Sequence, residues 1–342
     1  MPVELQEEVM AVVEQTRQRS GWSARRTLEA LGVSPASYYR WRCVAARRAG
    51  GGLGGRPRPV QPYEVLPEER EAVLQYALKH PELRHRELAW RMVDEDIAYL
   101  SPSTVYRILR AARLVCPWRR RRKRRREEQE KPRRPDECWA TDLKYVRVGE
   151  RNYYLITFID EYSRYIVHHE LLATMDGHSV SLAAQAALEK LGRDEGGKLR
   201  AEPEIRTDNG SGYISREFGG VLDEHGLSHR RIRPHCPEEN GVVERAQRTI
   251  GEALEGQELN NYYEAVRVID KVVYWYNHQR LHSALGFLRP LDYYRGNPAA
   301  LHEVRRQKLA RARHQRKEKN LRLRQRTLPL EALDPRRDCC LT

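Results

Sequence analysis

The sequence predicts a chain of several domains: all-α helix-turn-helix modules, then a mixed α/β domain, then a basic helical tail. Three observations predict this fold class. Apolar residues recur at helical spacing before residue 112, strand-like segments begin at Cys138, and the charge is divided into blocks. At 342 residues the chain is long enough for two or three domains with separate hydrophobic cores.

Charge is unevenly distributed along the chain, which carries 62 Lys and Arg residues against 48 Asp and Glu, a net charge of +14. Residues 1–135 have a net charge of +12 and residues 303–342 of +8, whereas residues 136–302 have −6. Basic arms favour nucleic acid as a partner, because Lys and Arg neutralise phosphates. An acidic centre beside them is explained if its carboxylates bind cations. A ribosomal or chromatin-type protein with an incidental acidic domain is the alternative.

Cysteine usage and hydropathy exclude several classes of protein. The six cysteines show no Cys-x-x-Cys spacing, so we expect neither a disulfide framework nor a zinc site. The first ten residues have no apolar signal-peptide core, and no apolar run reaches the roughly 18 residues of a membrane span. We therefore expect a reduced, intracellular protein with no membrane partner.

The N-terminal arm contains two groups of three predicted helices. The first group spans residues 5–18, a helix capped by Ser23, and a helix opened by Ser34 and Pro35 that ends near Arg42. The second group spans residues 67–79, 84–93 and 101–112. Three short helices with a tight turn before the last are typical of a helix-turn-helix.

The last helices of the two groups share a sequence pattern. Residues 34–40 (SPASYYR) align with residues 101–107 (SPSTVYR), which suggests two copies of one module. Small polar residues in the first turn and a nearby Arg suit base edges and phosphates. Favourable helix-start chemistry at Ser-Pro is the alternative explanation. The candidate DNA-contacting residues of these helices are Ser37, Tyr38, Arg40, Ser103, Thr104 and Arg107.

Two linkers flank the second module. Residues 47–61 contain five glycines and no apolar periodicity, so the modules are free to engage separate stretches of DNA. Residues 119–126 are eight consecutive basic residues, a run that repels itself until it meets a polyanion. We predict that it binds DNA, and a localisation signal is the competing interpretation. Its candidate contact residues are Arg119, Arg120, Arg121 and Arg122.

From Cys138 the pattern changes to strands. Segments 139–148, 153–160 and 165–171 are typical of strands, with a hairpin turn between the second and third. Beyond them the predicted elements are helix 178–191, strand 204–207, helix 215–225, strand 227–233, and helices 240–254 and 262–277. Three strands followed by alternating helices and strands describe a mixed sheet covered by helices.

Three acidic residues of this domain are the candidate catalytic and metal-binding residues: Asp142 in the first strand, Asp208 at the end of a later strand, and Glu244 on a helix. Without a cation, converging carboxylates raise one another's pKa, whereas Mg²⁺ binds such hard oxygen donors. Two ions there would activate a water or 3′-hydroxyl and stabilise the leaving oxygen of a phosphoryl transfer. Taken alone, each of the three acids has an ordinary explanation as a turn, edge or exposed residue. The prediction therefore depends on the three occurring together.

The helix of Glu244 adds two candidate DNA contacts. Asn240 and Arg248 share a face with Glu244 at i, i+4 spacing, and an amide and a guanidinium suit a site that holds metal beside a phosphate. An ordinary exposed Glu–Arg pair is the alternative. The identity of the third carboxylate stays open, because three other acids lie nearby: Asp160, Glu238 and Glu239. Helix phase and the Asn-Gly start favour Glu244.

These motifs resemble a known family. The spacing Asp208–x35–Glu244 resembles the D,D-35-E pattern of retroviral integrases and related bacterial insertion-sequence transposases. Residues 276–285 (YNHQRLHSAL) are similar to the Y-N-x-x-R-x-H-S-x-L segment that closes the core in many of these transposases. The similarity spans about residues 136–292. The other matching motifs are W-x-T-D at 139–142, D-x-x-S-R at 160–164, D-N-G at 208–210 and N-G-x-x-E at 240–244.

The resemblance implies an RNase H-like catalytic core that uses Mg²⁺ or Mn²⁺, cleaves transposon ends and transfers strands without a covalent protein–DNA intermediate. It implies double-stranded DNA as partner, both terminal repeats and target, and a homo-oligomer of at least two chains on paired ends. It also implies a cytoplasmic, nucleoid-associated bacterial protein, and leaves the need for an accessory ATPase open. Paired helix-turn-helix modules, in place of the zinc module of retroviral integrases, favour the bacterial branch. Arg206 lies two positions before Asp208, where members of the family often have His or Ser.

Two other classes of protein are alternatives to a transposase. The intact triad argues against a DNA-binding regulator with an inactive core, and the paired modules argue against a nuclease acting on hybrids or junctions.

The basic tail has three interpretations: it binds along DNA, it mediates assembly, or it is a solvated helix. The expected domains are a first module (1–46), a linker (47–62), a second module (63–115), a basic linker (116–135), the RNase H-like core (136–292) and the tail (293–342).

Overall fold

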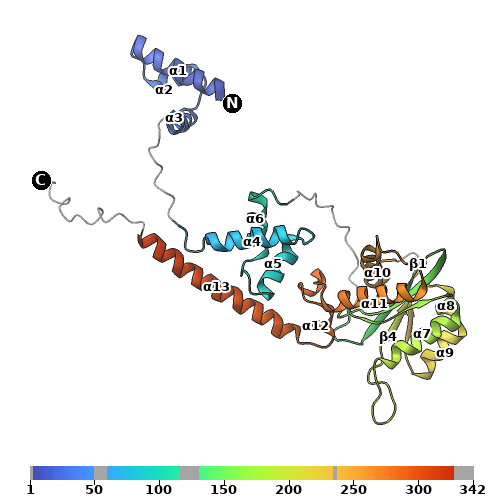
Figure 1. Cartoon of the computed structure of the whole chain (residues 1–342). Helices are drawn as coiled ribbons and strands as arrows, with labels where there is room; N and C mark the ends of the chain where they lie inside the picture. The colour runs from blue at the N-terminus through green and yellow to red at the C-terminus, as the bar shows by residue number, and fades with distance from the viewer. Residues whose placement is uncertain (1–2, 50–59, 116–130, 234–236, 327–342) are drawn as a thin grey trace. The chain divides into compact units, whose positions relative to one another are not determined.

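The computed structural model describes residues 3–49, 60–115, 131–233 and 237–326 (Figure 1). The chain divides into two compact units, one formed by residues 1–64 with 315–342 and the other by residues 65–314. The basic run at 119–126 lies outside the described residues. None of the helices in the described ranges is both long enough and apolar enough to cross a membrane.

The first unit contains three N-terminal helices, α1 (Val3–Ser20), α2 (Ala24–Ala30) and α3 (Pro35–Ala49). Val13, Leu28 and Tyr38 form its small core. The Ser23 hydroxyl accepts a hydrogen bond from the Arg26 backbone N–H and caps α2. The predicted end of α3 near Arg42 is wrong, because Ala and Arg favour helix and no breaker precedes Gly50.

The second unit begins with three more helices, α4 (Pro67–Lys79), α5 (His85–Asp94) and α6 (Pro102–Ala111). Their core contains Val73, Leu88, Met92 and Val105, all with at most 1% of their surface exposed. Ser101 caps α6 by accepting a hydrogen bond from the Thr104 backbone N–H.

The sheet of the second unit has five strands: β1 (Cys138–Val148), β2 (Arg151–Asp160), β3 (Ile166–Leu172), β4 (Glu204–Thr207) and β5 (His229–Arg231). Their order is β3-β2-β1-β4-β5. The first three strands are antiparallel neighbours, whereas β4 and β5 pair in parallel with β1 and β4. The predicted mixed sheet is therefore confirmed. Strand β5 is shorter than the predicted segment 227–233, because Leu227 belongs to the hydrophobic core beneath it.

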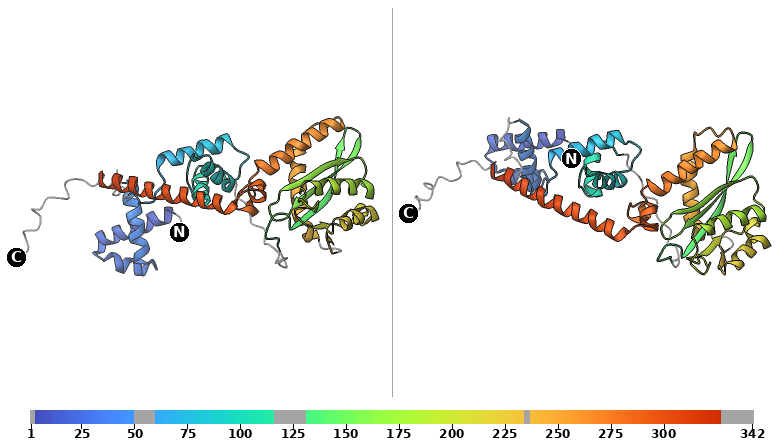
Figure 2. Two further views of the ribbon diagram at one scale, coloured as in Figure 1. Left: turned by 90° about the horizontal axis from the view of Figure 1, so that it is seen from below. Right: turned by 60° about the horizontal axis from the view of Figure 1, so that its bottom comes forward.

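Helices cover both faces of the sheet (Figures 1 and 2). Helix α7 (Gly177–Glu189) and helix α9 (Arg216–Glu224) pack on one face, around Trp139, Phe158 and Phe218. Helix α10 (Gly241–Leu254) and helix α11 (Tyr262–His278) pack on the other. A one-turn helix, α8 (Ser211–Ile214), precedes α9 and was not predicted, because Ser215 caps the next helix and separates the two.

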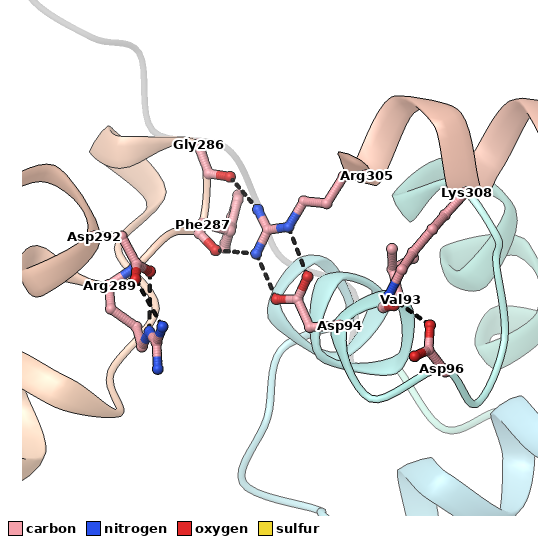
Figure 3. Close-up of polar contacts among 9 residues, drawn as sticks. All are labelled: Val93, Asp94, Asp96, Gly286, Phe287, Arg289, Asp292, Arg305 and Lys308. Atoms are coloured by element: carbon pink, nitrogen blue, oxygen red, sulfur yellow. Dashed lines mark hydrogen bonds and ion pairs between the residues drawn. The ribbon is translucent and has the colours of Figure 1, made fainter. Parts of the chain in front are cut away.

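The chain continues through two 3₁₀ turns, η1 (Pro237–Asn240) before α10 and η2 (Ser283–Leu285) after α11, to α12 (Pro290–Tyr294) and α13 (Pro298–Arg326). Figure 3 shows how the start of α13 is held within the second unit. The Arg305 guanidinium donates to both oxygens of Asp94, at 2.6 and 2.8 Å, and to the backbone carbonyls of Gly286 and Phe287. Lys308 pairs with Asp96. The first turns of α13 are therefore part of a buried polar network.

Candidate active site

Asp142 lies in the middle strand of the sheet, where β1 pairs with β2 and, further along, with β4. Its Oδ1 accepts a hydrogen bond from the backbone N–H of Leu143 at 2.9 Å. Behind it, the Thr141 hydroxyl lies 3.1 Å from the hydroxyl of buried Tyr213. The strand therefore fixes Asp142 beside a packed interior while leaving its second carboxylate oxygen available.

Asp208 follows directly after β4, the parallel neighbour of β1. Its Oδ1 accepts a hydrogen bond from the Gly210 backbone N–H at 2.9 Å, which closes the turn into α8. The Asn209 side chain donates to the carbonyl of Ile232 and fastens the same turn to the end of β5. Because β1 and β4 run in parallel, Asp142 and Asp208 lie towards the same end of the sheet.

Glu244 lies in the first turn of α10, on its exposed side, while Val243 and Ala246 are buried against the sheet. One turn further along, the Gln247 side chain donates to the backbone carbonyl of Asp142 at 2.8 Å and to the Thr157 hydroxyl at 3.3 Å. The Lys144 ammonium donates to the Gln247 carbonyl at 2.9 Å. These bonds fasten the helix of Glu244 to the strand of Asp142. No local pattern singles out Gln247, because a buried amide in an amphipathic helix cannot be told from an exposed one by sequence alone.

The charges of Asp208 and Glu244 act on the carboxylate of Asp142. Burial, together with these two negative charges, raises the pKa of Asp142 from 3.8 to about 6. The hydroxyl of Tyr213 also has a raised pKa, caused first by burial and then by the charges of Asp142 and Asp208. Asp208 and Glu244 are thus near enough to influence Asp142, whose buried environment disfavours an uncompensated negative charge.

The described residues do not contain a preformed metal cage. In residues 3–49, 60–115, 131–233 and 237–326, no three His, Cys, Asp or Glu side chains are close enough together to hold one ion. The donor chemistry of Asp142, Asp208 and Glu244 nevertheless suits Mg²⁺, since all three offer carboxylate oxygens, and a cation would relieve the repulsion between them.

Two neighbouring acids are engaged elsewhere. Asp160 is fully buried and accepts hydrogen bonds from the Ser163 hydroxyl and from the backbone N–H groups of Ser163 and Asp136. Glu239 is bound by the backbone and the guanidinium of Arg233, at 2.9 and 2.6 Å. Both carboxylates are therefore engaged in local structure, which favours Glu244 over Asp160 and Glu239 as the third member of the set, and the side chain of Glu238 lies outside the described residues.

Burial and pairing argue against some of the predicted DNA contacts. Tyr38 is only 3% exposed, because it packs in the core of the first unit, and Asn240 is only 2% exposed. Arg248 pairs with Glu252 at 3.0 Å rather than with Glu244, because the i, i+4 partner on the C-terminal side is also available. Four candidates lie at the helix surfaces, exposed or half-buried: Ser37, Arg40, Ser103 and Arg107. Thr104 is half-buried.

The same kind of local contact occurs within each of the two modules. An Nη2 group of Arg40 lies 3.4 Å from the Ser37 hydroxyl, and that of Arg107 lies 3.2 Å from the Thr104 hydroxyl. The aligned positions Tyr38 and Val105 are both buried. Arg206, which departs from the family pattern, is buried and pairs with Glu161 at 2.7 Å, so its role is in the support of β4.

Comparison with known proteins identifies the central domain. Residues 132–237 match one family model of the integrase core domain, and residues 225–290 match a second model of the same description. The first match includes Asp142 and Asp208, and the second includes Glu244.

Two relatives extend the similarity. The transposase for insertion sequence element IS904 of Lactococcus lactis is 30% identical over 175 residues, 49% of this chain and 64% of the relative. The 31.7 kDa protein of insertion element IS407 of Burkholderia multivorans is 27% identical over 70% of this chain and 87% of its own length. Among solved structures, the magnesium-bound integrase catalytic core of HTLV-2 covers 47% of this chain and 97% of its own, at 19% identity and a TM-score of 0.38. By the family-model matches, residues 132–290 belong to the integrase core domain, and the relatives show that the chain resembles insertion-sequence transposases.

Proposed function

We propose that the chain is a DNA transposase that cleaves transposon ends and joins them to target DNA through Asp142, Asp208 and Glu244. The observation that carries the proposal is that the integrase-core matches, 132–237 and 225–290, contain all three acids. The shared electrostatic environment of the three carboxylates supports it. Acting on paired ends, the transposase would work as a homo-oligomer, and an accessory ATPase is an open possibility.

The three carboxylates would hold Mg²⁺, with Mn²⁺ as a substitute. Bound metal would activate the attacking hydroxyl or water and stabilise the departing oxygen of the phosphodiester. The contribution of the chain is to fix the donors in place. Strand β1 and the Gly210 turn orient the two aspartates, and Gln247 keeps the helix of Glu244 against the sheet.

The N-terminal helices would supply the recognition of transposon ends. Helices α3 and α6 begin with the same Ser-Pro pattern and present Arg40 and Arg107 at their surfaces. A positive arm would bind the phosphates, while the small polar residues of the first turn would contact base edges. Zinc is not part of the proposal.

The test is a strand-transfer assay on the element's own end sequences, with wild type compared with Asp208→Asn and Glu244→Gln. We expect products that require Mg²⁺ and are reduced at least a hundredfold in both variants, while binding to duplex ends persists. Glu252→Gln, on the exposed face of the same helix, is the matched control and should leave product yield near that of wild type. Tight end binding without products in Mg²⁺ or Mn²⁺ would contradict the proposal and favour a DNA-binding factor.

A further inference from the structure

Three arginines from separate segments of the integrase core converge beside the end of α11. Arg164 lies in the turn between β2 and β3, Arg245 follows Glu244 on α10, and Arg280 lies just beyond α11. Burial raises the pKa of Tyr276 and lowers that of His282, and the positive charges of all three arginines act on both rings, so the arginines lie near the same pair of rings. We name this group the arginine cluster: Arg164, Arg245, Arg280 and His282.

Aromatic packing holds one side of the arginine cluster. The His282 ring meets the Tyr276 ring edge-on, with centroids 4.9 Å apart. The Arg280 guanidinium carbon lies 5.6 Å from the Trp275 ring centroid and 6.0 Å from that of Tyr276. These rings restrict the side chain of Arg280 without using its N–H donors, since a cation–π contact engages the face of the guanidinium.

The donors of the arginine cluster lack partners. Within the described part of the chain, the guanidinium groups of Arg164, Arg245 and Arg280 make no hydrogen bond or ion pair. The Nε of Arg280 and the Nε2 of His282 are buried with no hydrogen-bond partner there. Burial lowers the pKa of Arg164, of Arg280 and of His282, the last to about 3, so the imidazole is neutral.

The nearest acids offset these charges only in part, because each is bound elsewhere. Glu161 pairs with Arg206, Glu87 with Arg91, and Glu252 with Arg248. Asp160 accepts its hydrogen bonds from Ser163 and from the backbone N–H of Asp136. The charges of the three arginines repel one another, and those of Arg164 and Arg280 are also partly removed from water, which is unfavourable unless an anion binds among them.

The backbone at Arg164 adopts a conformation that is unusual for a residue other than glycine. Arg164 has a φ of +63°, a left-handed conformation in which glycine would be less strained. A side chain other than glycine costs roughly 1 kcal/mol there. Such strain is typical of positions where the side chain has a function.

We infer that the arginine cluster binds a phosphodiester group of the DNA on which the integrase core acts. Arginine donors form a fork that suits phosphate oxygens, and neutral His282 offers a ring nitrogen without adding a fourth charge. The inference rests on the proposed function in one respect. Arg245 is the neighbour of Glu244 on α10, so the bound phosphate lies on a strand that passes beside the three carboxylates.

The experiment measures duplex binding by the full chain with fluorescence anisotropy over a series of salt concentrations. Arg164→Gln, Arg245→Gln and Arg280→Gln are compared with wild type and with Arg267→Gln, an exposed arginine on α11 outside the arginine cluster. Loss of one phosphate contact should reduce the slope of log affinity against log salt by about 1. The control should keep the wild-type slope.

A second measurement uses inorganic phosphate alone. At equal ionic strength, phosphate should raise the Tm of wild type and of Arg267→Gln above the value in chloride, and should not raise that of the cluster variants. The Tm in chloride reports whether each variant is folded. If the variants at Arg164 or Arg280 do not fold, the comparison uses Arg245→Gln, because Arg245 is exposed.

The outcomes separate this inference from the proposed function. Wild-type slopes in all three cluster variants, or equal stabilisation of every variant by phosphate, would overturn the arginine cluster as a phosphate site even if strand transfer is active. Reduced slopes in the cluster variants with no strand transfer by wild type would instead support the phosphate site and remove the transposase proposal.

Discussion

The hydrogen-bond donors around each acidic side chain decide what that side chain is free to do. Asp160 accepts three hydrogen bonds and Glu161 forms a buried pair with Arg206. The Asp142 carboxylate, in contrast, has one bond, from the Leu143 backbone N–H. Its remaining lone pairs are available to a ligand, which distinguishes it from acids that stabilise turns.

A buried acid that is not part of the catalytic set gives a prediction about pH. Burial raises the pKa of Asp160 from 3.8 to about 6, against the opposing effect of its hydrogen bonds. Since the folded state binds the proton more tightly, the stabilisation is complete below pH 3.8 and is lost as pH rises to 6. Wild type should therefore lose up to about 3 kcal/mol relative to Asp160→Asn between pH 4 and 7.

Denaturant unfolding at several pH values measures this difference. Asp223→Asn, an exposed aspartate on α9, is the control and should show a constant difference from wild type across the same range. A constant difference for Asp160→Asn as well would show that the folded chain does not raise the pKa of Asp160.

At the scale of elements, local signals predicted most starts and ends closely, with the end of α3 as the clearest miss. Strand Glu204–Thr207 was predicted with its observed bounds, and Ser23 and Ser101 cap the helices that they were expected to open. These features depend on neighbouring residues, and such residues are visible in a sequence. The end of α3 at Ala49 was missed although Ala and Arg favour helix up to Gly50, whereas the shortness of β5 depends on packing in space, which local pattern does not contain.

The same reasoning explains the candidate site. The acids were predicted because carboxylates at strand ends and on a helix form a recognisable set. Gln247 was missed, because its role depends on a contact with Asp142 across 105 residues of chain. Arg248 was assigned to DNA from its spacing alone, and the neighbouring Glu252 changes its partner.

Gln247 should act as a positioning residue for α10. Gln247→Ala removes two hydrogen bonds that fasten the helix to β1 and β2, at a cost of about 1–2 kcal/mol in stability. A small shift of Glu244 relative to Asp142 should lower the rate of strand transfer at least tenfold, since a displacement of about 1 Å is enough for larger losses. Single-turnover rates at saturating DNA measure the effect, with end affinity unchanged.

Gln257→Ala, at an exposed position beyond the end of α10, is the matched control. Gln247→Glu separates structure from chemistry, because it keeps the size of the side chain but replaces the donor. A wild-type rate in Gln247→Ala would show that packing alone positions α10.

At the scale of the whole chain, the sequence predicted the types of element but not their pairing. The order β3-β2-β1-β4-β5 brings β4 beside β1 across an intervening helix, which depends on long-range packing. The buried network around Arg305 is likewise invisible to local pattern, since it joins Asp94 to the turn at Gly286 and Phe287. The basic tail was considered only as a DNA-tracking, assembling or solvated helix, and its first turns have this additional structural role.

Arg305 should therefore contribute to stability far more than the residue beside it. Its guanidinium is only 4% exposed and forms bonds to Asp94, which is 42% exposed, and to two backbone carbonyls. Arg305→Ala should lower the free energy of unfolding by about 2–3 kcal/mol, a value reduced from that of a fully buried pair because water reaches Asp94. Arg306→Ala, whose side chain is 74% exposed and pairs with Glu303, should cost less than about 0.5 kcal/mol. Urea unfolding followed by tryptophan fluorescence compares the two, and equal costs would show that the α13 network does not stabilise the second unit.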